Sequence, residues 1–69
     1  MIEDYELIDF VRGYRKPQQM YEEYGVFTQA LTGQFYGRIS PKDISEIITR
    51  MLRLKLLYRQ KNGYIKFMV

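Results

Sequence analysis

Polar and basic side chains recur on one face of the stretch RISPKDISEIITRMLR, residues 38–53. Helical spacing places them opposite the apolar residues of the same stretch. Lysine, arginine, serine and threonine are residue types that contact base edges or phosphates of nucleic acids. The chemistry available to this stretch is therefore hydrogen bonding and charge pairing with a polyanion. The candidate contact residues are Arg38, Ser40, Lys42, Ser45, Thr49, Arg50 and Arg53.

Glu46 lies on the same face, where a carboxylate would repel phosphates. It can accept a hydrogen bond from a cytosine amino group. Alternatively it can pair with Arg50, four residues later, and orient that guanidinium. Of these two interpretations we favour the ion pair.

A second basic group follows in LLYRQKNGYIKFMV, residues 56–69. Asn62-Gly63 is a strong signal for a type I′ hairpin turn, which needs positive φ at both central residues. We predict strands over 56–61 and 64–68. Lysines also protect exposed strand edges from pairing with other chains. We favour contact with DNA beside a groove, made by Arg59, Lys61 and Asn62, with Lys66 nearby.

Two helices are predicted before the polar stretch. The first covers about residues 3–12 and ends at Gly13, and the second begins at Pro17 and ends at Gly33 or Gly37. Pro is well placed in a first helical turn. We expect Phe35 and Tyr36, in the connector, to pack onto the core. The apolar face expected for the second helix consists of Met20, Tyr24, Phe27 and Leu31.

The third helix has the clearest beginning. Ser40 is the predicted cap, Pro41 the first helical residue, and Asp43 completes a capping box. Ile39 and Ile44 occupy the two positions of a hydrophobic staple. The predicted core residues of this helix are Ile44, Ile47, Ile48, Met51 and Leu52, with the Lys55 stem extending them.

Two helices, a capped helix and a basic hairpin, in that order, predict a winged helix-turn-helix. The expected fold is mainly α with a β-hairpin: three helices plus a two- or three-stranded wing, forming a single domain over 1–69. Such folds normally place a short strand between the first two helices. GYRKP, residues 13–17, leaves little room for one, so the sheet is expected to be two-stranded or to borrow a few residues there.

Charge is divided unevenly along the 69 residues, whose net charge is +3. Residues 1–36 contain three basic and six acidic side chains, whereas residues 37–69 contain eight basic and two acidic ones. A basic surface at one end of a fold is the usual electrostatic footprint of a polyanion partner. A solvated positive surface without any partner would have the same composition.

The composition offers little for catalysis. Without cysteine or histidine, the chain lacks the usual zinc ligands and the side chain best suited to proton transfer near neutral pH. Sequential Glu22 and Glu23 would diverge on a helix. We therefore expect no enzyme activity, no cofactor, no metal and no small-molecule substrate.

No apolar run approaches the roughly 20 residues of a membrane span. The N-terminal stretch MIEDYELIDF is acidic, which argues against a signal or transit peptide. These observations favour a cytoplasmic protein with no membrane partner.

Tyrosines could stack on the bases of single strands. Tyr21, Tyr24, Tyr58 and Tyr64 occupy helical or strand-alternating positions. We therefore expect them to be core or rim residues with solvated hydroxyls rather than a stacking platform.

The segments LIDFVRGYRKPQQMYEEY and RISPKDISEIITRMLRLKLL resemble the C-terminal winged-helix domain of archaeal origin-recognition initiator proteins. Tyr21 and Tyr24 fit the family's second helix, and the run from Ser45 to Leu57 approximates its recognition helix and strand start. The family's ATPase module is absent, and Lys55 stands where a small residue, often glycine, is usual. The resemblance implies the fold and DNA contact by the third helix and wing. The chain also looks like small winged-helix regulators of archaeal viruses and plasmids.

Together these features predict a double-stranded DNA-binding protein, a small transcriptional or replication regulator. The helix starting at Ser40 would read the major groove, and the wing over 59–66 would contact the backbone. A single module buries little surface on DNA, so we favour a homodimer. The alternative is a winged-helix protein–protein interaction module, docking a partner through its first helix or Phe35-Tyr36.

Overall fold

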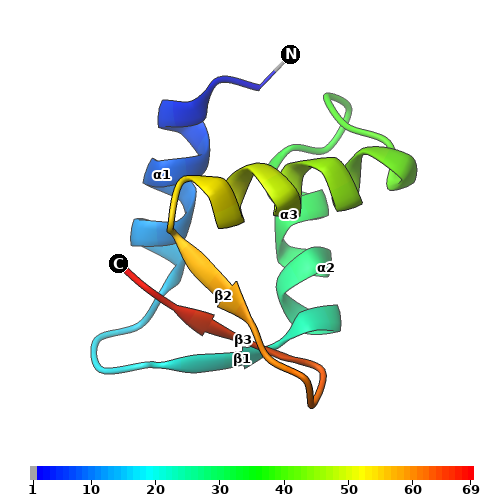
Figure 1. The fold of residues 1–69 in the computed structure, drawn as a ribbon. Coiled ribbons are helices and arrows are strands. Elements are labelled where there is room, and N and C mark those ends of the chain that lie inside the picture. Colours follow the sequence, from blue (N-terminus) through cyan, green and yellow to red (C-terminus); the bar gives the residue numbers. More distant parts are fainter. Residues whose placement is uncertain (1) are drawn as a thin grey trace.

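The structure is a computed structural model that describes residues 2–69. Over this range the element order is that of a winged helix-turn-helix, with three α-helices and three short strands (Figure 1). The predicted fold class is confirmed. The elements are α1 (Asp4–Tyr14), β1 (Tyr21–Glu23), α2 (Tyr24–Gln34), a 3₁₀ turn (Pro41–Asp43), α3 (Ile44–Arg53), β2 (Leu57–Arg59) and β3 (Tyr64–Phe67).

The sheet has three antiparallel strands in the order β1-β3-β2. In register, Tyr21 of β1 and Tyr58 of β2 both lie opposite Lys66 of the central strand. The three-stranded alternative is therefore the one observed. The additional strand lies after GYRKP rather than within it, because the chain first turns at Pro17.

The prediction that the second helix begins at Pro17 is wrong. The Gln19 N–H donates to the Lys16 carbonyl over 3.0 Å, and Gln18 has φ 66°. In a type II β-turn, proline is common at the second position and the third residue has a positive φ. The chain then extends into β1, and α2 begins only at Tyr24. Met20 consequently lies outside the helix and is exposed rather than part of its apolar face.

The start of the third helix is confirmed. The Ser40 N–H donates to Asp43 Oδ2 over 2.8 Å, Pro41 occupies the first helical turn, and the capping box is present. Ile39 and Ile44 are half-buried against the core. The prediction for Lys55 is wrong, because it is exposed beyond the helix end. The other predicted core residues are buried (Ile47, Ile48 and Met51) or half-buried (Leu52).

The hairpin turn differs from the type I′ prediction. The Gln60 N–H donates to the Tyr64 carbonyl over 2.8 Å, which leaves residues 61–63 as the loop. Gly63 has φ 86°, but Asn62 is not among the residues with positive φ. A three-residue loop ending in a left-handed glycine is the next most common hairpin connection. The Tyr24 N–H also donates to the Gly63 carbonyl over 2.9 Å, which pins the wing tip to the start of α2.

One hydrophobic core joins the helices to the inner face of the sheet. Figure 1 shows α3 lying in front of α1 and α2, with the sheet below. Phe35 is buried as predicted, whereas Tyr36 is 86% exposed, so the prediction for Tyr36 is wrong. None of the helices over residues 2–69 is long and apolar enough to cross a membrane. The largest fully buried side chains are Phe27, Leu7, Leu31, Met51, Leu57, Ile65 and Val11.

Candidate nucleic-acid interface

The outward face of α3 and the turn before it is polar. Lys42, Ser45, Thr49 and Arg53 are exposed, while the opposite face is anchored in the core. The Thr49 hydroxyl donates to the Ser45 carbonyl over 2.9 Å, so this threonine is partly engaged by its own helix. Among residues 2–69, neither Lys42 nor Arg53 has an ion-pair partner. The face can therefore donate hydrogen bonds and offer two uncompensated positive charges.

Arg50 does not lie freely on this face. Its side chain is 24% exposed, and its guanidinium pairs with the carboxylate of Asp4 at the start of α1. The predicted Glu46–Arg50 pair is wrong, since the guanidinium instead turns towards α1. Glu46 remains exposed beside the basic residues, where it would repel a phosphate.

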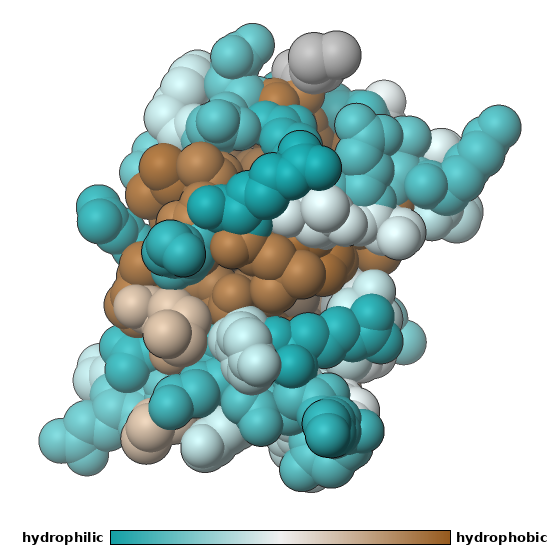
Figure 2. All heavy atoms as spheres, in the orientation of Figure 1, coloured by the Kyte–Doolittle hydropathy of each residue, from teal (hydrophilic) through white to brown (hydrophobic). Residues whose placement is uncertain are grey.

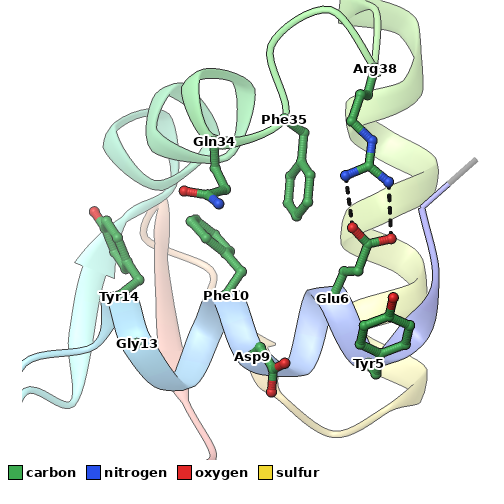
Figure 3. Close-up of a pocket in the computed structure, with 9 residues that line it drawn as sticks. All are labelled: Tyr5, Glu6, Asp9, Phe10, Gly13, Tyr14, Gln34, Phe35 and Arg38. Carbon is green, nitrogen blue, oxygen red and sulfur yellow. Dashed lines mark hydrogen bonds and ion pairs between the residues drawn. The ribbon is translucent and has the colours of Figure 1, made fainter.

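Arg38 also faces α1 (Figure 3). Its two terminal nitrogens donate to the two carboxylate oxygens of Glu6 over 2.7 and 3.0 Å. The guanidinium additionally lies 5.6 Å from the ring centre of Phe35. The bidentate contact lowers the pKa of Glu6 from 4.5 to about 2, with help from the Glu3 N–H. The charge of Arg38 is therefore already compensated at neutral pH.

Ser40 has a structural role in this geometry. Its hydroxyl donates a hydrogen bond to Asp43 Oδ2 over 3.1 Å. The same oxygen also accepts a hydrogen bond from the Ser40 N–H. These hydrogen bonds lower the pKa of the Asp43 carboxyl. The residue orients the start of the helix from which Lys42 projects.

The wing contributes a second basic region. The guanidinium of Arg59 lies 3.8 Å from the ring centre of Tyr24 at the start of α2, a distance suited to cation–π attraction. Lys61 is exposed in the loop. The Asn62 side-chain oxygen accepts from the Tyr64 N–H over 3.3 Å. Arg59 is thus positioned by α2, Asn62 shapes the loop, and Lys61 is available to a ligand.

The face that contains α3 is not uniformly hydrophilic. Figure 2 shows an apolar band across it, between hydrophilic side chains above and below. Among the apolar residues at the end of α3, Leu52 and Leu54 are only half-buried. A ligand on this face would therefore meet apolar surface as well as charge.

A groove of about 510 Å³ lies between α1 and the end of α2 (Figure 3). Burial and a hydrogen bond donated to Glu22 raise the pKa of Tyr14 to about 12. Glu6, held by Arg38, is ionised. Neither group changes its protonation near pH 7, so these two offer no acid–base chemistry there. Within residues 2–69, no three metal-ligating side chains gather closely enough to hold an ion.

The residues that contact the predicted arginines are not recognisable as their partners from the sequence. Asp4 and Glu6 lie in the first turn of α1, where negative charge is favourable near the positive end of the helix dipole. Tyr24 read as an apolar position. The ion pairs span 46 and 32 residues, and no local spacing signal reports such contacts.

Three comparisons were made, with known protein families, with curated proteins and with solved structures; none found a match.

Proposed function

We propose that this protein binds double-stranded DNA, with α3 in the major groove and the wing against the adjacent backbone. In helix-turn-helix proteins the second helix of the motif occupies the groove and presents its N-terminal residues to base edges. Here α3 is the helix that follows α2, so it corresponds to the second helix of the motif. Lys42 and Ser45 lie at its N-terminal end, and Arg53 at its C-terminal end.

The exposed face of α3 is the single observation that carries the proposal. Within the described range 2–69, Lys42 and Arg53 have no ion-pair partner, while Ser45 and Thr49 offer short polar side chains between them. Lys42 lies near the positive end of the helix dipole, where a cation gains nothing in stability. A phosphate partner would give that charge a role.

The test is fluorescence anisotropy with a labelled random-sequence duplex of about two helical turns, titrated across a salt series. Each neutralised phosphate contributes about 0.9 to the slope of log K against log salt. We expect Lys42→Ala and Arg53→Ala each to lower the slope by about 0.9. Lys16→Ala is the matched control, because Lys16 is an exposed lysine in the turn between α1 and β1. Equal slopes for Lys42→Ala and Lys16→Ala would remove α3 from the interface.

The apolar band in Figure 2 favours a second candidate, a winged-helix protein–protein interaction module. Apolar contacts respond weakly to salt, whereas phosphate contacts respond strongly. If the chain binds a partner protein through this face, Leu52→Ser should weaken that interaction. The affinity of such a complex should change little between low and moderate salt.

A further inference from the structure

The outer face of the sheet, which the helices do not cover, carries a row of aromatic side chains. Residues directly opposite in an antiparallel sheet share a face. Tyr21, Lys66 and Tyr58 are paired in register across the three strands. Tyr64 is two residues from Lys66 and therefore points the same way. Ile65 and Phe67 alternate with them and are buried on the inner face.

The tyrosines of this face are exposed, so of the two expected placements, core or rim, the core placement is wrong for them. Tyr58 is 60% exposed, Tyr21 48% and Tyr64 39%. Tyr24, the fourth tyrosine of that expectation, is half-buried beneath Arg59. Three tyrosines around one lysine form an amphipathic surface, which we call the tyrosine face (Tyr21, Tyr58, Tyr64 and Lys66).

A hollow of about 320 Å³ opens on the tyrosine face, lined by Tyr21, Gln60, Asn62 and Tyr64. Two of its walls are phenol rings, and two are amide side chains. Aromatic rings stack on any base, and amides can both donate to and accept from base edges. A hollow of this chemistry suits an unpaired base.

We propose that the tyrosine face binds single-stranded nucleic acid, with bases stacked on its tyrosine rings and a phosphate beside Lys66. Aromatic platforms combined with a cationic groove are the general means of binding single strands. Among the strand residues that the structure describes, Glu23 is the only carboxylate at a paired position of this face, at the edge opposite Tyr64. The phosphates would therefore lie on the Lys66 side of the face, away from that charge, while the bases stack on Tyr21, Tyr58 and Tyr64. This surface is separate from the exposed face of α3 and goes beyond duplex binding.

A second copy of the chain fits this surface less well. A two-fold interface centred here would bring Lys66 towards its own symmetry mate. Lysine is depleted in the cores of protein interfaces because its charge is costly to bury there. The central lysine favours a polyanion over a self-complementary protein contact.

The experiment measures anisotropy of a labelled 12-nucleotide oligo(dT) at low salt, with the full chain and single variants. We expect Tyr21→Ala and Tyr58→Ala each to weaken binding by at least about 5-fold, from the stacking lost per base. Tyr58→Phe should retain near-native affinity, because the ring remains. Glu23→Gln should strengthen binding. Tyr36→Ala is the matched control, since Tyr36 is 86% exposed in the connector before the 3₁₀ turn.

The outcomes separate the alternatives. The platform is supported if Tyr21→Ala and Tyr58→Ala both lose affinity for oligo(dT) while their circular dichroism stays native. Tyr58→Phe and Tyr36→Ala should then bind with unchanged affinity. No binding by the native chain, or equal effects of Tyr36→Ala and Tyr58→Ala, overturns it. A concentration-dependent dimer that Tyr58→Ala disrupts, without oligo(dT) binding, assigns the face to a second copy and also overturns it. Duplex affinity measured on the same variants should stay constant, so failure here is distinguishable from failure of duplex binding.

Discussion

Replacing Lys55 with glycine should stabilise the fold. The Leu56 N–H donates to the Met51 carbonyl over 3.0 Å, and the Lys55 N–H donates to the Leu52 carbonyl over 3.1 Å. These two hydrogen bonds form the Schellman motif that ends α3. The motif requires a left-handed residue, and Lys55 has φ 59°. Glycine is the usual residue at this position because it has no Cβ.

The expected gain follows from that geometry. A left-handed conformation costs an L-residue roughly 1–2 kcal/mol relative to its preferred region. Glycine avoids this cost but loses more backbone freedom on folding, by roughly 0.5–1 kcal/mol. We therefore expect Lys55→Gly to raise the free energy of unfolding by about 0.5–1 kcal/mol. For a domain of this size, this corresponds to a Tm increase of about 2–8 °C.

Urea denaturation and a thermal melt, both followed by far-ultraviolet circular dichroism, measure the change. Lys55→Ala is the matched control, because it removes the charge and stem but keeps the Cβ and the strain. It should show no comparable gain. If Lys55→Ala stabilises as much as Lys55→Gly, the benefit comes from removing the charge. If neither variant stabilises, the left-handed residue is not strained and the reasoning fails.

Three further predictions concern the ion pairs and the cap. Asp4→Asn should release Arg50 and raise duplex affinity by about 1.4- to 5-fold, the equivalent of a surface ion pair of ~0.2–1 kcal/mol; anisotropy on the variant measures this. The pKa of Glu6 is lowered from 4.5 to about 2 by Arg38, so its stabilisation is complete above pH 4.5 and is lost as the pH falls to about 2. Glu6→Gln should flatten that part of the urea-midpoint profile. Ser40→Ala should cost about 1 kcal/mol of unfolding free energy, as read from the urea midpoint.

The third helix was predictable because its signals are local. Ser40, Pro41 and Asp43 lie within four residues and specify the start, and a regular apolar spacing specifies the buried face. The strand β1 was not predictable in this way, since Tyr21–Glu23 is stabilised by pairing with residues more than 40 positions later. Pro17 suits both a first helical turn and the second position of a β-turn. Tertiary pairing decided between them.

The candidate interface was predictable only in part, for a related reason. Periodicity identifies which residues of α3 point outward, and Lys42 and Arg53 are exposed as expected. Periodicity does not report what else packs beside that face. The carboxylates of Asp4 and Glu6 come from a distant helix and compensate Arg50 and Arg38. A list of basic residues therefore overstates the charge that a ligand meets.

Because Arg38 and Arg50 are paired with carboxylates, fewer cations remain for binding the phosphates of a duplex. Their number decides how tightly a single copy can bind DNA. Of the basic residues predicted to contact DNA, Lys42, Arg53 and Lys61 have neither an ion-pair nor a ring partner within residues 2–69. Three neutralised phosphates give a salt slope of about −2.7, so a fourfold rise in salt would weaken binding about 40-fold. Two copies bound to neighbouring half-sites would give a salt slope of about −5.4. The same fourfold rise in salt would then weaken binding roughly 2,000-fold. A slope near the first value would mean that one chain binds alone and weakly. A slope near the second would favour a dimer, because it corresponds to about six neutralised phosphates, twice the number that these three residues supply.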